Sequence, residues 1–221
     1  MGREGTTAAP PLATSLEELI ERARALARSG PRRLLGITGA PGAGKSHLAT
    51  AIARALGPEA SVVAMDGFHL ANGELARLGR RERKGAPDTF DGAGYVALLR
   101  RLREPGTETV YAPRFEREIE EPVAAAVAVE PAVRLVVTEG NYLLVDSPPW
   151  AAVRPLLDET WFCDLDDELR VHRLVARHEA YGKSSEEARA WALGSDERNT
   201  RMVAVTRSRA DLVVRLAGAA P

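Results

Sequence analysis

The sequence contains only one cysteine, Cys163, and no apolar run of about eighteen residues. One thiol cannot form an internal disulfide, and Cys and His residues at the spacing of a structural zinc site are also missing. Residues 1–11 carry a single cation, Arg3, and no apolar block, so they do not resemble a secretory signal. We therefore expect a cytoplasmic protein that does not interact with membranes.

An excess of charge of either sign is also missing, because 30 Lys and Arg residues balance 31 Asp and Glu residues. This balance argues against a general nucleic-acid binder. A local basic cluster lacks interleaved aromatic residues, so it either guides a small anion or stays solvated; it comprises Arg77, Arg80, Arg81, Arg83 and Lys84. What remains is 221 residues, 45% of them hydrophobic, enough for one large globular domain.

Five short apolar runs without polar alternation predict buried strands, at 34–38, 62–65, 135–138, 160–163 and 212–216. Helical segments lie between several of them, including 45–56, 94–103 and 168–181. This order indicates an α/β fold in three layers, with a mostly parallel five-stranded sheet and helices on both faces.

Residues 1–14 lack a periodic pattern and are expected to form a flexible N-terminal arm. Order is expected from Ser15, which together with Glu18 matches a capping box before a first helix. We expect residues 15–221 to form one domain, with an acceptor-side excursion over about 67–120 and a helical lid over about 168–184.

Residues 39–46 read GAPGAGKS, a full match to the phosphate-binding pattern G-x-x-x-x-G-K-[ST]. The loop follows a predicted strand and opens a predicted helix, so its amides and the helix dipole can cradle an anion. Lys45 is expected to contact the β and γ phosphates, and the Ser46 hydroxyl to bind Mg²⁺. The expected nucleotide contacts are Gly39, Ala40, Gly42, Ala43, Gly44, Lys45, Ser46 and His47.

Two acidic residues follow predicted strands, and strand ends of a parallel sheet face the same crevice. Asp66 is placed to take a proton from an attacking hydroxyl, although Asp66-Gly67 also suits a simple turn. Glu139 is placed to hold Mg²⁺, usually through water, although it also suits a cap or turn. Phe68 and His69 either line an acceptor pocket or pack in the core.

Arg170, Arg173 and Arg177 share one face of a predicted helix. Arginines near a phosphate site can neutralise the migrating phosphoryl group, whereas an exposed helix paired with local acids is the alternative. Trp191, further along, is expected in the core.

Five segments occur in an order that resembles the P-loop small-molecule kinases, which include type I pantothenate kinase, uridine kinase and phosphoribulokinase. These are the phosphate loop, 65–68, 83–91, 111–115 and 139–144. The likeness spans residues 32–216 and is closest to a bacterial branch described as nucleoside/nucleotide kinase-like or fructokinase-like. It implies a P-loop NTPase fold in which Asp66 is the catalytic base, Lys45 contacts phosphate, Ser46 and Glu139 bind the metal, and Arg173, then Arg177, act from the lid.

The same resemblance places the acceptor beside Asp66, Phe68, His69, Lys84, Tyr111, Arg114, Arg117 and Asn141, and it places residues 199–209 near the acceptor or the nucleotide base. Where pantothenate kinases carry a tyrosine and then a histidine, this chain has Phe115 and Arg117. Arg114 and Arg117 suit a hydroxyl-rich or anionic acceptor, or else they pair with Glu116 and Glu118 on the surface.

Together these features predict a kinase that uses ATP and Mg²⁺ to phosphorylate a hydroxyl of a small metabolite, a nucleoside or sugar ahead of a pantothenate-like alcohol. The resemblance implies a homodimer, and no nucleic acid or membrane partner is expected. The alternative is a regulatory module that binds ATP without chemistry. Lys45, Asp66 and Glu139 at three strand ends favour the kinase, because a sensor needs no proton acceptor.

Overall fold

A parallel β-sheet forms the centre of the computed structural model, which describes residues 12–104, 106–182 and 184–216. Its strand order is β1-β8-β7-β2-β6-β3, and every recorded pairing is parallel. The strands are β1 (Leu12–Ala13), β2 (Arg33–Gly39), β3 (Ala60–Ala64), β6 (Leu135–Glu139), β7 (Glu159–Cys163) and β8 (Leu212–Val214). All five residues of β6 are buried, which explains why this strand shows no polar alternation.

The expected five-stranded sheet is therefore corrected to six strands. The additional strand β1 lies within the predicted N-terminal arm, where Leu12 pairs with Val213 and Ala13 with Val214. Two residues are too short a stretch for a hydrophobic period to be visible in the sequence. Residues 1–11 of the predicted arm lie outside the described residues.

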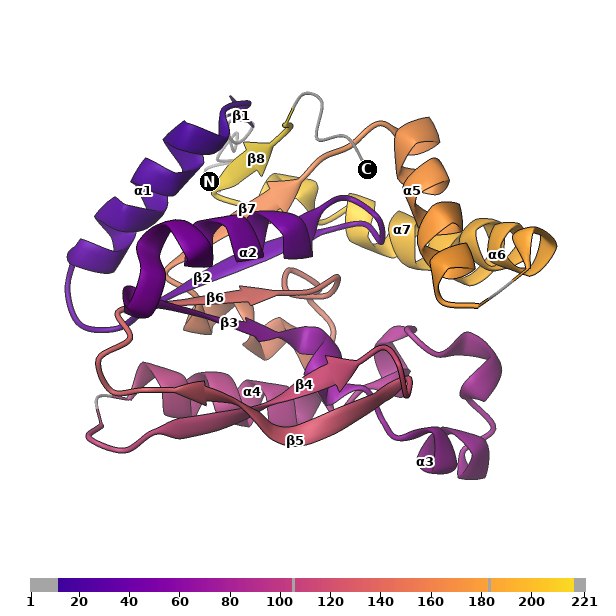
Figure 1. The fold of residues 1–221 in the computed structure, drawn as a ribbon, viewed down its shortest axis with the longest axis horizontal. Helices are drawn as coiled ribbons and strands as arrows, with labels where there is room; N and C mark the ends of the chain where they lie inside the picture. The colour runs from indigo at the N-terminus through magenta and orange to yellow at the C-terminus, as the bar shows by residue number, and fades with distance from the viewer. Residues whose placement is uncertain (1–11, 105, 183, 217–221) are drawn as a thin grey trace, which may run out of the picture.

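Helices cover both faces of the sheet and form the expected three layers (Figure 1). On one face lie α1 (Leu16–Arg28) and α2 (Lys45–Leu56), which bury apolar side chains such as Leu19 and Ile52 against β2, β6, β7 and β8. On the other face lie α4 (Gly92–Arg103) and α7 (Glu197–Ala204), which pack around Trp150. The predicted helix at 45–56 has the observed bounds, and that at 94–103 begins two residues earlier.

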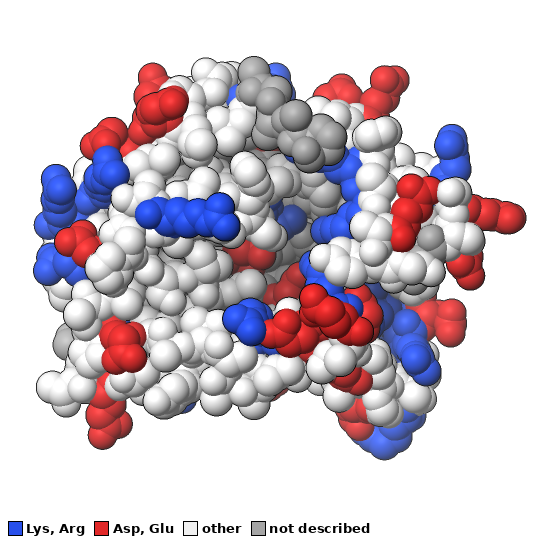
Figure 2. Space-filling view, viewed as in Figure 1, with Lys and Arg blue, Asp and Glu red and all other residues white. Residues whose placement is uncertain are grey.

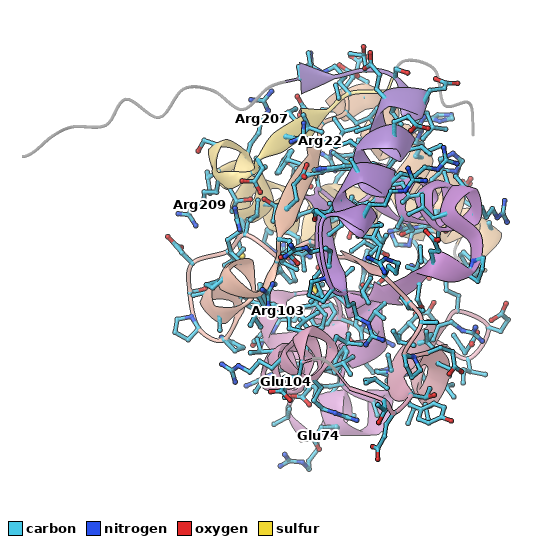
Figure 3. The ribbon with its side chains drawn as sticks, turned by 90° about the vertical axis from the view of Figure 1, so that its left-hand side faces the viewer. Arg22, Glu74, Arg103, Glu104, Arg207 and Arg209 are labelled. Atoms are coloured by element: carbon cyan, nitrogen blue, oxygen red, sulfur yellow. The ribbon has the colours of Figure 1, made fainter. Side chains whose placement is uncertain are left out.

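The start of α1 shows how local sequence sets an element. The Ser15 side chain accepts a hydrogen bond from the Glu18 amide, as a helix N-cap does. Further along α1, Arg22 forms an ion pair with Glu159 at the start of β7, and Figure 3 labels Arg22 on this helix. These contacts fix α1 over the sheet.

Two additions to the sheet frame one end of it. The first comprises α3 (Asn72–Arg77) and the antiparallel hairpin of β4 (Val110–Glu116) and β5 (Glu121–Val129), which the sequence analysis did not predict. The second comprises α5 (Asp167–Ala180) and α6 (Ser185–Trp191), which we call the lid and which lie at the right of Figure 1. A π-helical turn over Ala192–Asp196 joins the lid to α7. Within the described ranges, no helix is long and apolar enough to cross a bilayer.

Candidate active site

The phosphate loop, residues 39–46, connects β2 to α2 as the sequence predicts. Gly44 adopts a left-handed conformation with φ 89°, which turns the backbone into the first turn of α2. The first amides of α2 receive no side-chain cap, so they stay available for an anion. The Lys45 ammonium donates to the Ala40 carbonyl at 2.9 Å, within the loop itself. Burial lowers the pKa of Lys45, and the nearby Glu139 carboxylate opposes this shift.

Glu139 ends β6, and its Oε1 accepts a hydrogen bond of 2.9 Å from the Ser46 hydroxyl. Burial raises the pKa of Glu139, and the negative charge of Asp66 adds to the rise. A buried carboxylate beside a hydroxyl, with a second carboxylate near, is a set of hard oxygen donors that suits Mg²⁺. The charge of such a cation would also favour the ionised form of Glu139. The residues present therefore fit the expected metal.

Asp66 lies in a 3₁₀ turn, Met65–Phe68, that directly follows β3. The next residue, Gly67, is pressed against the hairpin: a Cβ added to it would lie 2.4 Å from the Pro113 carbonyl oxygen. This close approach brings the β4–β5 turn to the Asp66 carboxylate, whose Oδ2 is 3.5 Å from Arg117 Nη2. The glycine after the aspartate thus positions a second chain segment at the site.

These groups open into one cavity of about 410 Å³. Figure 2 shows acidic and basic side chains around the hollow between α2 and the lid. The cavity brings together nine of the residues expected at the site, namely Lys45, Ser46, Asp66, His69, Lys84, Arg117, Glu139, Asn141 and Arg177. The Asp66 carboxylate and the phosphate loop therefore share a single cavity, as the sequence hypothesis requires.

Three residues expected beside the acceptor do not line this cavity. Phe68 packs in the core with its ring centroid 5.2 Å from that of Tyr95. Tyr111 is exposed, with 57% of its surface accessible. Arg114 is paired with Glu116, as the surface alternative predicted. Residues of a strand alternate between its faces, so neighbours in a motif need not point into the same space.

The three lid arginines have different surroundings. Arg170 is buried and forms ion pairs of 2.9 Å with Asp167 and Glu197, so it supports the lid and not the cavity. Arg173 lines a separate pocket of about 230 Å³, together with Ala43, Gly44 and His47. Only Arg177 of this set lines the main cavity. Arg173 thus lies beside the phosphate loop and Arg177 in the main cavity, and the expected order of their roles, Arg173 before Arg177, stays a prediction.

The segment 72–91, which we call the acceptor segment, is held by hydrogen bonds to the loop after β6, to α7 and to the turn of the hairpin. The Tyr142 hydroxyl and the Asn199 amide both donate to the Gly85 carbonyl, the latter at 3.2 Å. Lys84 donates to Asn72 Oδ1 at 2.9 Å and to the Glu120 carbonyl. These bonds fix one wall of the cavity.

His69 packs inside this wall between aromatic rings. Its ring centroid lies 4.0 Å from that of Phe90 and 4.8 Å from that of Phe115, and its Nδ1 donates to the Asp66 carbonyl at 2.8 Å. Burial lowers the pKa of His69. A neutral imidazole here holds the turn that carries Asp66 through its Nδ1 hydrogen bond.

Sequence reasoning missed several residues that line the cavity, including Tyr181, Trp191 and Asp196. Trp191 was expected in the core but is half-buried at the cavity wall. His178 Nε2 lies 2.9 Å from Asp196 Oδ2 and so links α5 to the π-helical turn. No residue pattern in the sequence predicts the π-helical turn, so its residues could not be assigned to the cavity before the structure was known.

Of the stretch 199–209, only Asn199 reaches the cavity. Arg207 forms an ion pair of 3.3 Å with Asp164, and Arg209 donates to the Leu144 carbonyl. Figure 3 shows both arginines at the periphery of the fold. Arg209 lines neither pocket, so its expected place is corrected, whereas Asp164, the partner of Arg207, lines the pocket of Arg173.

Comparison with known proteins adds sequence relatives to this geometry. A family model described as "Phosphoribulokinase / Uridine kinase family" matches residues 34–219. A Schizosaccharomyces pombe protein named "Putative uridine kinase C227.14" is 34% identical over 189 residues, which cover 81% of this chain and 80% of that protein.

Solved structures give the same picture. The crystal structure of a "putative fructose transport system kinase" from Silicibacter sp. TM1040 is 36% identical with a TM-score of 0.81, covering 91% of this chain and 99% of that chain. YFH7 from Saccharomyces cerevisiae, at 17% identity, shares the fold with a TM-score of 0.79 over 92% of this chain and 99% of its own.

Proposed function

The chain belongs to the phosphoribulokinase/uridine kinase family of P-loop kinases, and from this premise we propose that it transfers the γ-phosphoryl group of ATP to a hydroxyl of a small metabolite in the presence of Mg²⁺. One observation carries the proposal. The Asp66 carboxylate, from the turn after β3, faces the same cavity as Lys45 of the phosphate loop and Glu139 of β6. A nucleotide-binding module without chemistry has no need of that carboxylate.

At the phosphate end, the uncapped amides of α2 and the Lys45 ammonium bind the phosphate oxygens. The ammonium leaves the Ala40 carbonyl to do so. Ser46 and Glu139 would hold Mg²⁺, which when bound would supply positive charge to the phosphates. Arg177 supplies a further positive charge from the lid.

At the acceptor end, the Asp66 carboxylate accepts the proton of the acceptor hydroxyl. The hydroxyl oxygen then forms a bond to the γ-phosphorus, and the bond between that phosphorus and the bridging oxygen breaks to release ADP. Water in the same place would hydrolyse ATP, so we propose that the lid closes over the cavity. The separate pocket beside Gly44 and Arg173 is then the place for the nucleotide base.

The acceptor we propose is a nucleoside or a sugar, ahead of a pantothenate-like alcohol. The cavity has aromatic walls at Phe90, Phe115 and Trp191, on which a base or a sugar ring can stack. Charged and amide groups beside them, among them Asn141, suit a molecule with several hydroxyls.

The test is ADP release measured with a panel of nucleosides, sugars and other alcohols. Asp66→Asn is expected to reduce kcat for the best acceptor by about 10²- to 10⁴-fold while ATP affinity is retained. Asp88→Asn is the matched control, because Asp88 lies outside the cavity and pairs with Arg80 and Arg83 on the surface. Unchanged transfer in Asp66→Asn would eliminate this residue as the base. Tight ATP binding with a flat response to the whole panel would favour a regulatory module.

A further inference from the structure

The guanidinium of Arg117 is held at the cavity by aromatic rings more than by acids. Its Cζ lies 5.7 Å from the ring centroid of Phe115 and 5.7 Å from that of Tyr181. Its one polar contact with the described part of the chain is Asp66 Oδ2, at 3.5 Å, the long limit of a hydrogen bond. The side chain lines the cavity, and most of its five N–H donors have no acceptor among the described residues.

Two neighbouring cations, Lys84 of the cavity wall and Arg114 of the hairpin, are engaged, whereas Arg81, which also lines the cavity, is exposed. Lys84 donates to Asn72 and to the Glu120 carbonyl and lies over the Phe115 ring. Arg114 is exposed and bound to Glu116. Arg117 therefore differs from both, because it is stacked in place and yet its charge is not used by the fold.

Arg177 is a second, buried cation in the cavity whose guanidinium has no hydrogen bond or ion pair with another described residue. Burial lowers its pKa, and the positive charge of Arg117 adds to the shift. Two guanidinium groups from separate elements thus repel each other across the cavity. An anion between or beside them removes this repulsion.

The two arginines lie toward different ends of the site. Arg117 contacts the Asp66 carboxylate at 3.5 Å and stacks on Phe115 in the acceptor wall, whereas the charge of Arg177 acts on the pKa of Lys45 in the phosphate loop. The phosphates of ATP account for Arg177. Arg117 needs an anion from the other substrate.

We infer that Arg117 binds an oxyanion, a carboxylate or a phosphate, that the acceptor itself carries. The inference rests on the proposed kinase activity, and it replaces the neutral nucleosides and sugars ranked first above by hydroxyl compounds with their own negative group. Because Arg117 is 3.5 Å from Asp66, the oxyanion and the reacting hydroxyl lie roughly 9 Å apart at most. Hydroxy acids, sugar phosphates and nucleoside monophosphates meet this condition, and the flat fork of an arginine matches either oxyanion.

The experiment uses acceptor pairs that differ in the oxyanion. D-glycerate is compared with glycerol, D-fructose 6-phosphate with D-fructose, and uridine 5′-monophosphate with uridine. Transfer is followed by ADP release, and binding by calorimetry on the full chain with Mg²⁺ and a non-hydrolysable ATP analogue. In at least one pair, the anionic member is expected to bind and react about tenfold to a hundredfold better than its neutral twin. The pair that responds tells a carboxylate from a phosphate.

Arg117→Met is expected to abolish this preference, mainly through the acceptor KM, and Arg117→Gln gives a second neutral variant if methionine impairs folding. Arg114→Met removes the same charge from the same hairpin outside the cavity, and it is expected to keep the preference. A preference that survives in Arg117→Met overturns the inference. Equal use of the two members of every pair also overturns the inference. The proposed kinase activity then still holds, because the neutral members are phosphorylated. If no compound binds and none is phosphorylated, both this inference and the proposed kinase activity are overturned.

Discussion

Alanine in place of Gly67 perturbs the contact that joins the Asp66 turn to the hairpin. The new methyl group would lie 2.4 Å from the Pro113 carbonyl oxygen and 3.2 Å from the Arg114 amide nitrogen. Both are backbone atoms, so no side-chain rotation relieves the overlap. Since carbon and oxygen atoms approach to about 3.3 Å in proteins, the hairpin must withdraw by about 1 Å.

This withdrawal has two expected effects. Overpacking of a buried contact costs about 1–3 kcal/mol in the free energy of unfolding. The hairpin also carries Arg117, whose 3.5 Å contact with Asp66 is already at its limit and breaks. A displacement of about 1 Å near the reacting groups reduces kcat/KM for the acceptor about 10²-fold, while the KM for ATP stays the same because the phosphate loop does not move.

Urea unfolding measures the first effect, and steady-state ADP release with the best acceptor measures the second. Gly73→Ala is the matched control, because a Cβ at that position in α3 meets no atom within 4 Å. It is expected to change the free energy of unfolding by no more than about 1 kcal/mol. If Gly67→Ala behaves like Gly73→Ala in both assays, the close packing of hairpin and turn is not what positions the site.

Three further changes probe other contacts. His69→Phe removes an imidazole whose pKa is held below its ordinary 6.5 by burial. The parent protein should therefore lose stability as the pH falls through 6.5, and the variant should lose less. Urea unfolding between about pH 5 and 8 measures the difference. The exposed His172→Gln is its control, and equal pH profiles for parent and His69→Phe would contradict the reasoning. Ser46→Ala should raise the Mg²⁺ concentration for half-maximal activity about tenfold, with recovery in Ser46→Thr; an unchanged Mg²⁺ titration argues against metal binding there. Tyr142→Phe removes a hydrogen bond to Gly85 and should cost about 1 kcal/mol and raise the acceptor KM more than the ATP KM; equal KM changes would count against it.

The sequence predicted the sheet and the phosphate loop well, because both have strong local signals. Runs such as 135–138 lie in strands that are buried throughout, and their apolar character follows directly from that burial. The phosphate loop and the start of its helix are predicted by the glycines and Lys45 of a single eight-residue pattern, residues 39–46. The hairpin of β4 and β5 left no such signal, since β5 exposes alanines in its middle and the contact of the hairpin with Gly67 is made by Pro113 of β4.

At the site, residue types were easier to predict than their directions. Asp66 and Glu139 were identified because every parallel strand ends at the same edge. The lid arginines share a helix face as expected, but rotation of α5 against the loop decides that Arg177 and not Arg173 enters the main cavity. Phe68 packs against the core and not in the cavity. The sequence could not distinguish the two places, because an apolar ring suits either a core or a pocket wall.

The wall that faces the acceptor is built from chain segments that add no strand to the central sheet. Residues 72–91 and the β4–β5 hairpin rest on it as attachments, whereas the loop that grips phosphate is continuous with β2. Substitutions in the attachments can therefore retune what is phosphorylated without disturbing how the donor is held. The same fold can thus accept different substrates while the phosphoryl transfer itself stays the same. Randomisation of the attachments is therefore the first step in a search for variants with new acceptors.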